Sequence, residues 1–579
     1  MLVLFCLYIY IFLTSVAFGS IIVALFLRTS GKQSMACPYP CDIVSVIGFA
    51  GITTVFSIYS LFCGLGGLLP HVILLCISLL SFLCLHGNTQ QNMRNGLSFQ
   101  SIIMGSFVAI PFFAGIVIFA LQSPLVYDSA LYHAQAIQWI EKLPVVKGLG
   151  NLNGRLAFNS SFFIPSALYG FSFVGQQTYY PLNSYFSILF VVRAIIAIKN
   201  SLTRNDYAVA FMYASLLFIS FFFLRIHSSS PSTDALPLIL LFYLFVLFER
   251  FSNDVRSPTY LLIVVLSFFL VTVKVSYIGT ICLPLLYFYL EAVNRNTKNY
   301  LWSGLAATII VFPWLIRNII LSGYIVYPFP ALDIFDVDWK IPLDWTICEI
   351  NWIKSCAISW KESPHNVLQL PFSEWITLWW RDIPLPNKIL TVCSTISPVV
   401  LVTTAVKKKV RRELFFFWLT CFISLCIWFV SAPDIRFVYG FMILCTAITV
   451  YGVASLLPCS GPKQIGRWFL PALALLGLLI TIYPLVSGSK IEGFSARQFM
   501  SPHQWKQAAT VEKHIAGGML IKVGTTGTRC KYPDVTCDPY LNQGCLCFNE
   551  EIPCAPCYNP RLLLRGSNIK EGFRTMNKH

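Results

Sequence analysis

Charged residues are scarce in this chain. Asp, Glu, Lys and Arg make up 11% of its 579 residues, whereas 56% are hydrophobic and the mean hydropathy is +0.69. A soluble domain carries about a quarter of charged residues, so this composition excludes a soluble globular protein. The apolar runs are continuous and show no alternation of apolar with polar residues, which excludes a closed β-barrel as well.

Acidic residues are scarcer than basic ones, with 25 against 41, which gives a net charge of +16. A nucleic-acid interface would gather the basic residues into one patch. Here they lie in short loops between apolar runs, which is typical of the residues that orient a membrane protein. We therefore expect no nucleic-acid partner. The first apolar run, 2–27, lacks a basic leader and is too long for a signal-peptide core, so it predicts a retained helix.

Fourteen apolar runs approach the roughly 20 residues that cross a bilayer as a helix. They predict an all-α polytopic membrane protein. The run 162–174 is too short to cross and contains Pro165, so we expect it to be re-entrant or interfacial. The predicted spans are 2–27, 44–65, 69–86, 100–122, 184–198, 207–224, 235–249, 258–273, 276–292, 300–316, 389–406, 413–431, 437–457 and 468–486.

The basic run 407–412 is the strongest cytoplasmic mark in the sequence. With this run inside, the other basic loops also fall inside and both termini fall outside. The outward segments are then the loops 123–183 and 329–388 and the tail 487–579. The tail 487–579 is then predicted to be a small extracytoplasmic domain that follows the transmembrane helices of 1–99 and 100–486.

Cysteine usage agrees with an outward tail. Six of the 20 Cys lie there, and an even number suits disulfides in an oxidising compartment. The same spacing resembles a zinc cluster, which stays an alternative. Cys348 and Cys356 could form a further bridge in the loop 329–388. The tail cysteines are Cys530, Cys537, Cys545, Cys547, Cys554 and Cys557.

Five ionisable residues lie at the outer ends of predicted spans, where such groups are costly and usually functional. Bases there would bind a phosphate, and an acid would accept a proton from a nucleophile. Each also has an ordinary interpretation; Asp234 could be a helix N-cap and Lys274 could extend its amine to the interface. The five are Asp128, Asp234, Lys274, Arg317 and Arg436.

The segment 124–160 follows one span and begins with Tyr127 and Asp128. An amphipathic stretch comes next and carries His133 and Glu141 away from its apolar face. A glycine-rich turn then leads to Asn159. An acid beside a surface-lying helix predicts a reaction at the membrane interface, whereas the ordinary alternative is a loop that joins two helices.

The loop 329–388 is rich in Trp, which stacks on sugar rings but also anchors interfacial helices. Its acids Asp333, Asp336 and Asp338 could bind a divalent cation, with a solvated turn as the alternative. The Trp residues are Trp339, Trp345, Trp352, Trp360, Trp375, Trp379 and Trp380.

The order of these features resembles the GT-C superfamily of polytopic glycosyltransferases, which includes protein O-mannosyltransferases and the lipid A aminoarabinose transferase. The matching elements span roughly 100–457, and many relatives have a second acid where this chain has Ser129. The chain also resembles uncharacterised bacterial membrane proteins with similar signatures. The matching elements are Tyr127–Tyr132, Phe158–Phe163, Asp234, Val273–Lys274, Pro313–Asn318 with Tyr327–Pro328, and Arg436–Phe437.

The resemblance implies an inverting glycosyltransferase of a bacterial inner membrane whose site faces the periplasm. Its donor would be a polyprenyl-phosphate-linked sugar and its acceptor a glycan or lipid. Asp128 and Asp234 would be catalytic; whether a divalent cation (Mg²⁺ or Mn²⁺) takes part stays open, because relatives differ. The expected substrate-binding residues are Tyr127, His133, Glu141, Asn159, Lys274, Arg317 and Arg436.

Two other classes of function stay open. A transporter or flippase would show polar residues at mid-membrane and paired repeats of broken helices. This chain has its charges mainly at one edge and no internal repeat, although Arg193 lies inside a span. A non-catalytic subunit of a glycan-assembly complex would explain the absence of a second acid beside Asp128.

Overall fold

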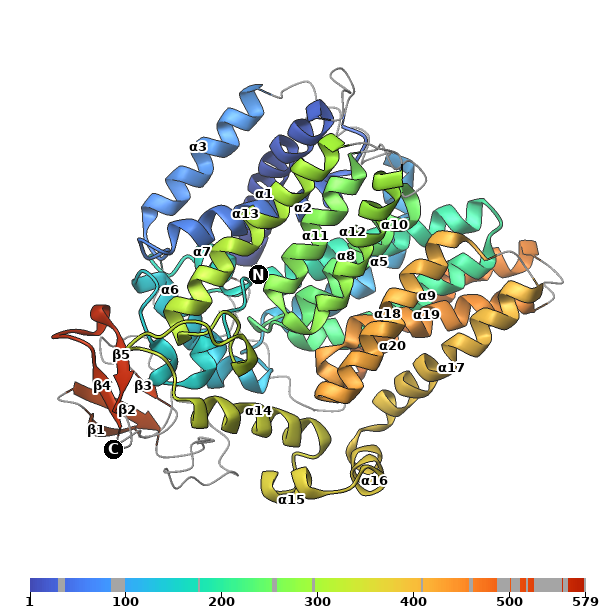
Figure 1. The fold of residues 1–579 in the computed structure, drawn as a ribbon. Coiled ribbons are helices and arrows are strands. Elements are labelled where there is room, and N and C mark those ends of the chain that lie inside the picture. The colour runs from blue at the N-terminus through green and yellow to red at the C-terminus, as the bar shows by residue number, and fades with distance from the viewer. Residues whose placement is uncertain are drawn as a thin grey trace.

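The computed structural model in Figure 1 is a bundle of helices with a small β-rich segment at one end. The prediction of a helical membrane protein is confirmed, because eight of the described helices are long and apolar enough to cross a bilayer. The structure describes residues 1–29, 37–84, 99–174, 178–251, 258–293, 297–407, 410–457, 462–486, 500, 511–516, 519–524, 554–555 and 561–576.

The eight long helices coincide with predicted spans. They are α1 (Leu2–Thr29), α2 (Cys41–Tyr59), α8 (Leu182–Thr203), α9 (Tyr207–His227), α13 (Thr297–Ser322), α17 (Leu385–Lys407), α18 (Arg412–Ser431) and α19 (Tyr439–Leu456).

Six further helices correspond to the other predicted spans, but their described apolar stretches are only 10–17 residues long. The total of fourteen spans therefore stays a prediction. These helices are α3 (Leu68–Cys84), α5 (Phe99–Ala120), α10 (Ala235–Phe251), α11 (Thr259–Val273), α12 (Cys282–Val293) and α20 (Pro462–Val486).

Small residues bring helices into close contact, as expected where lipid offers no hydrophobic drive for association. A Cβ atom on Gly19 of α1 would lie 1.9 Å from the Val44 oxygen of α2, and one on Gly48 of α2 would lie 1.8 Å from the Ser15 oxygen. The α1–α2 pair therefore depends on both glycines. The helices α10 and α11 are buried on all sides, which places them at the centre of the bundle.

The predicted span 276–292 differs from its prediction at its start. Lys274 is extended, and a 3₁₀ helix, η4 (Val275–Ile281), precedes α12. In this segment Gly279 lies so close to α18 that a Cβ atom would be 2.0 Å from the Ser424 hydroxyl. The 3₁₀ segment that precedes α12 is therefore packed tightly against α18. An apolar run in the sequence does not show that this part of the span is not α-helical.

The loop 123–183, called the first outer loop after its predicted side, consists of short helices. Its α7 has six residues, too few to cross a bilayer, as predicted for the run 162–174. The elements are the π-helix η1 (Ser129–His133), α6 (Ala134–Lys142), the 3₁₀ helices η2 (Leu149–Asn151) and η3 (Gly154–Ala157), and α7 (Phe163–Leu168).

The loop 329–388, called the second outer loop, lies along the lower edge of the bundle in Figure 1. The expected bridge between Cys348 and Cys356 is wrong. Both lie on α14 and neither is in a disulfide. Eight residues of helix separate them by about 12 Å, beyond the reach of a disulfide. The loop contains η5 (Pro330–Leu332), α14 (Leu343–Ile358), α15 (Pro364–Gln369) and α16 (Phe372–Asp382).

The tail contains strands, which the prediction of an all-α fold omitted. A three-stranded sheet has the order β1-β2-β3, and β4 pairs with β5 as an antiparallel hairpin. Residues of high β-propensity explain the strands. The pairing of the six tail cysteines lies outside the described residues. The strands are β1 (Val511–Ala516), β2 (Met519–Gly524), β3 (Cys554–Ala555), β4 (Leu562–Leu564) and β5 (Phe573–Thr575).

The hairpin β4–β5 joins the tail to both outer loops. The Thr575 hydroxyl donates to Oδ1 of Asn151 in the first loop at 2.7 Å. Two nitrogens of Arg565 donate to the carboxylate of Asp338 in the second loop, at 2.9 and 3.0 Å. Asn151 also donates to the Trp339 carbonyl at 2.8 Å. The three segments predicted to face outward therefore meet at one end of the molecule.

Candidate functional site

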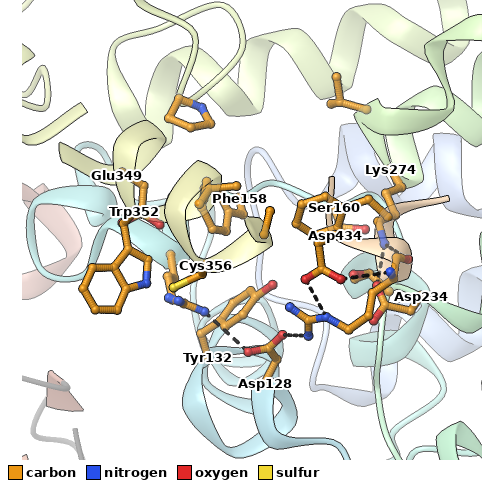
Figure 2. Close-up of a pocket in the computed structure, with 18 of the residues that line it drawn as sticks. Asp128, Tyr132, Phe158, Ser160, Asp234, Lys274, Glu349, Trp352, Cys356 and Asp434 are labelled. Atoms are coloured by element: carbon orange, nitrogen blue, oxygen red, sulfur yellow. Dashed lines mark hydrogen bonds and ion pairs between the residues drawn. The ribbon is translucent and has the colours of Figure 1, made fainter. Parts of the chain in front are cut away.

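A cavity of about 620 Å³ lies where the two outer loops meet the ends of several helices. Its polar wall comes from connections that join one helix to the next. Figure 2 shows Asp128, Asp234, Lys274 and Asp434 around it, with Glu349 and Trp352 of α14 on another side. Such a concave site with convergent polar groups is the usual form of a binding site.

Local backbone structure positions these side chains. Asp128 directly precedes η1, and π-helical turns are rare and frequent at functional sites. Asp234 directly precedes α10, and Lys274 directly follows α11. Arg436 lies in the 3₁₀ helix η6 (Ile435–Phe437), where Asp434 caps the turn by accepting from its backbone N–H at 3.0 Å. All four positions are at one end of the bundle.

Two acids and two arginines form a continuous row of ion pairs. Arg155 Nη1 lies 3.4 Å from Oδ1 of Asp128, and Arg436 Nη1 lies 3.1 Å from Oδ2 of the same carboxylate. Arg436 Nε also lies 3.0 Å from Oδ2 of Asp434. Both oxygens of Asp128 are thus held by a guanidinium group, which fixes the plane of its carboxylate.

A further ion pair adjoins this row. Lys274 Nζ lies 2.5 Å from Oδ1 of Asp234 and donates to the Arg436 carbonyl at 3.1 Å. The interpretation of Lys274 as a side chain reaching out to the interface is therefore wrong, because Asp234 and Arg436 hold its amine. These contacts join three acids to three bases, and Glu349 is a further acid close to Arg155.

The surroundings keep the two predicted catalytic acids ionised. Burial alone would raise the pKa of Asp128, but Arg436 and Arg155 outweigh burial and hold the pKa below its ordinary value. For Asp234, burial is likewise outweighed by Lys274 and then Arg436, and the pKa falls further. Both residues are carboxylates at neutral pH, able to accept a proton but not to donate one.

His133 lines the cavity with an unusual side chain. It is buried, with 2% of its surface exposed, and neither ring nitrogen has a hydrogen-bond partner within the described residues. Burial lowers its pKa to about 4, so the imidazole is neutral at physiological pH. A neutral imidazole offers one donor and one acceptor. Both hydrogen-bonding positions of the imidazole are thus buried and unsatisfied within the described residues.

Asn159 lines the cavity and is held from behind. Its side chain donates to the Trp314 carbonyl at 3.0 Å and accepts from Arg317 Nε at 3.2 Å. Arg317 itself is 3% exposed, does not line the cavity, and donates from Nη1 to the Ser60 hydroxyl at 2.7 Å. The structure thus brings Asn159 to the cavity and leaves Arg317 behind it.

Glu141 also lies apart from the cavity. Its carboxyl group is buried and accepts from the Thr178 hydroxyl, with Oε1 at 2.9 Å. Burial raises its pKa to about 8, so at neutral pH Glu141 is protonated in most folded molecules. The structure brings together the other predicted residues, which are Tyr127, Asp128, His133, Asn159, Asp234, Lys274 and Arg436.

A protein-family model, described as a domain of unknown function (DUF8201), matches residues 1–443. The chain belongs to this family. Every cavity-lining residue named above lies within the matched part, whereas α20 and the tail follow it. No match was found among curated proteins or among solved structures.

The DUF8201 region contributes further cavity residues that the sequence interpretation did not select. Arg155 is the most consequential, because it pairs with Asp128. The sequence feature that could have indicated Arg155 is the glycine-rich turn, because Arg155 directly follows its last glycine, Gly154. Asp434 lies two residues before Arg436, and Glu349 and Trp352 belong to the Trp-rich loop. The sequence does not show that Arg155 pairs with Asp128, because this contact depends on how the first outer loop folds.

The described acids of this DUF8201 chain do not form a site for a divalent cation. Within the described residues, no three His, Cys, Asp or Glu side chains gather as metal ligands would. The expected acidic group in the second loop is divided, because Asp333 pairs with Lys340 and Asp338 with Arg565. Of the five acids that line the cavity, Asp128, Asp234 and Asp434 pair with bases of the cluster, and Asp382 pairs with Lys361.

The tryptophans of the second loop have several surroundings. Trp352 and Trp360 line the cavity, where they can stack on a sugar ring. Trp379 of α16 is buried and donates to the Pro433 carbonyl at 2.8 Å, next to Asp434. Trp339 lies beneath the Arg565 guanidinium, whose centre is 5.0 Å from the ring. Only part of the group is therefore available to a ligand in the cavity.

Proposed function

We propose that this DUF8201 chain is an integral membrane glycosyltransferase with a GT-C-like core of fourteen spans. It would transfer a sugar from a polyprenyl-phosphate-linked donor to a glycan or lipid acceptor at the periplasmic face of a bacterial inner membrane. One observation carries the proposal: the Asp128 carboxylate lies between two arginines in a cavity of about 620 Å³ where membrane helices end. A lipid-linked donor and a polar acceptor can meet in such a place.

Asp128 acts as the general base in this reaction. The acceptor hydroxyl oxygen forms a bond to the anomeric carbon as the bond from that carbon to the phosphate oxygen breaks. The electron pair leaves with the phosphate, and the hydroxyl proton passes to Asp128. Attack from the face opposite the phosphate inverts the anomeric carbon. An ionised Asp128 is ready for this step at neutral pH.

The bases of the cavity stabilise the leaving phosphate. Arg436 is the best placed, because its side chain is 46% exposed and it connects the Asp128 and Asp234 groups. Lys274 adds a second positive charge, which Asp234 keeps in position. Such fixed charges act where negative charge develops. Arg155 orients Asp128, while Arg317 positions Asn159 and does not reach the phosphate.

The acceptor occupies the side of the cavity formed by α14. Trp352 and Trp360 offer aromatic faces to a sugar ring, and Glu349 lies close to Arg155 on the same side. These aromatic faces suit a neutral or weakly polar glycan. His133 provides one further hydroxyl-binding group close to Asp128.

A non-catalytic role in an assembly complex is the second candidate, and one observation favours it. Both oxygens of Asp128 already accept from arginines, so a substrate hydroxyl must displace or share one of these contacts. A cluster that serves only to hold the two outer loops together would show the same pairing.

Analysis of lipid-linked sugars in membranes separates these functions. A deletion strain is complemented with wild-type protein, Asp128→Asn or the control Asp333→Asn, whose acid lies outside the cavity. We expect one polyprenyl-phosphate sugar to accumulate in the deletion and Asp128→Asn strains and to be consumed with the control. An Asp128→Asn protein that is present in membranes and restores the lipid pool would contradict the proposed function.

A further inference from the structure

A second cavity, of about 200 Å³, lies at the other end of the helices that bear the first. It is formed by α8, α9, α10 and the residue before α18. The helix α10 begins beside Asp234 at the first cavity, and its Glu249 lines the second. Fifteen residues of helix separate these two points by about 22 Å. The two cavities therefore lie near opposite faces of the membrane.

Three arginines line the second cavity, namely Arg193, Arg204 and Arg411. Arg193 is buried at 5% exposure and binds Asp42 through Nε, at 2.6 Å, and through Nη2. A guanidinium group has five N–H donors, so this pairing leaves donors for a ligand. Arg411 pairs with Glu249 through one nitrogen, Nη2. Both pairs hold the guanidinium groups in fixed positions.

The acids near this cavity are already engaged. One oxygen of Glu249 is bound by Arg411, and the other accepts from the Tyr213 hydroxyl at 2.5 Å. Asp206 caps α9 by accepting from the Val209 N–H at 3.2 Å. Their negative charge is therefore partly neutralised where an anion would enter.

Arg204 differs from the other two arginines. It is exposed at the end of α8, and no ion pair or hydrogen bond of its side chain is present among the described residues. The same end of the bundle carries Lys199, Lys407 and Arg412, as expected for the cytoplasmic side. A free guanidinium at the mouth of a cavity that already contains two oriented ones is suited to bidentate recognition of phosphate.

We propose that this second cavity binds the phosphate group of an anionic ligand at the cytoplasmic face. Two sources share this chemistry: the headgroup of an anionic phospholipid and a soluble phosphate compound. Basic pockets between membrane helices on this side are known to accept anionic lipid headgroups. The inference does not rest on the proposed glycosyltransferase activity.

Thermal unfolding of the full-length purified chain in lipid nanodiscs tests the proposal. One set of discs contains phosphatidylcholine only, a second contains added phosphatidylglycerol, and a third contains phosphatidylcholine with inorganic phosphate in the buffer. The variants are Arg204→Gln and the control Lys199→Gln, which removes the same charge from the same helix but lies outside the cavity. Equal unfolding temperatures in phosphatidylcholine establish that each variant is folded.

We expect phosphatidylglycerol or phosphate to raise the unfolding temperature of the wild-type chain and of Lys199→Gln. In Arg204→Gln the ligand concentration needed for half of this rise should increase about fivefold, the usual effect of one basic residue. A rise with the lipid alone identifies a headgroup as the source, and a rise with phosphate alone identifies a soluble compound. The proposal is overturned if neither ligand stabilises the wild-type chain, or if Arg204→Gln and Lys199→Gln respond alike.

Discussion

Arg436 donates from Nη1 to Oδ2 of Asp128 at 3.1 Å, although 308 residues separate the two in sequence. This contact joins the segment that follows α5 to the turn that precedes α19. It also connects the proposed base to the proposed phosphate-binding group. Three of the predictions below concern this cluster and the cavity around it.

Replacement of Asp128 by Asn should reduce transfer by about 10²–10⁴-fold, the usual contribution of a general base. Asn keeps the size of the side chain but cannot accept the proton. The measurement is the turnover of purified protein with a lipid extract from the deletion strain. Asp333→Asn is the matched control, and its turnover should equal that of the wild type because Asp333 lies outside the cavity.

The pH dependence of transfer should show an acid limb below pH 3.8, the ordinary Asp value, because Arg436 and Arg155 lower the pKa of Asp128. The carboxylate is thus present at all higher pH, and the stability from its ion pairs is lost only as pH falls through this lowered pKa. Arg436→Gln removes one positive charge and should move the acid limb to higher pH. An unchanged limb in this variant would show that Asp128 is not the titrating group.

Glu141→Gln should alter stability without altering transfer. The folded chain holds the Glu141 proton with a pKa of about 8, against 4.5 ordinarily, because the group is buried. The associated stability is fully present below pH 4.5 and is lost as pH rises through 8. Gln carries no charge, so the variant should unfold at the wild-type temperature at pH 5 and at a higher temperature at pH 9. Equal unfolding temperatures at pH 9 would contradict a buried, proton-binding Glu141.

Asn159→Ala should weaken both stability and transfer. The change leaves Arg317 Nε and the Trp314 carbonyl without their buried partner, at a cost of about 1–3 kcal/mol. Arg317→Lys keeps the charge but loses the fixed fork of donors, so we expect a smaller fall in unfolding temperature with a similar fall in transfer. An Arg317→Lys protein with unchanged transfer would exclude the role of Arg317 in positioning Asn159.

The pair of Arg565 and Asp338 should hold the hairpin β4–β5 against the second outer loop. Arg565→Asp places two acids together and should expose the tail to limited proteolysis. The exchange Arg565→Asp with Asp338→Arg restores opposite charges and should restore much of the resistance. If the single and double variants are cleaved at the same rate, this pair does not hold the hairpin.

The sequence was sufficient to predict most of the helices. It was also sufficient to predict that the two outer loops and the tail lie at the same end of the bundle. Apolar runs mark helices of a membrane protein directly, and the basic loops indicate which ends lie together. This sidedness placed Asp128, Asp234, Lys274 and Arg436 on one face of the bilayer, and in the structure all four line one cavity. It could not say which acid pairs with which base, because pairing depends on how neighbouring helices are rotated and offset.

Two predicted site residues show the limit of this reasoning. Arg317 and Glu141 lie at the expected end of the bundle, but helix α13 turns Arg317 towards Ser60 and α6 turns Glu141 towards Thr178. Both side chains are polar and buried without lining the cavity. Membrane depth can be inferred from an apolar run, whereas the direction of a side chain requires its packing partners. Arg155 was missed for the same reason.

The hairpin β4–β5 has a consequence for biogenesis. It contacts both outer loops through Thr575 and Arg565, yet a ribosome synthesises it after every helix of the bundle. In the proposed orientation, both outer loops cross the membrane before the tail does. A chain that ends before residue 561 would contain all the helices of the bundle but would lack the hairpin β4–β5. The contacts of the hairpin with both loops therefore form only after the whole transmembrane part has been synthesised.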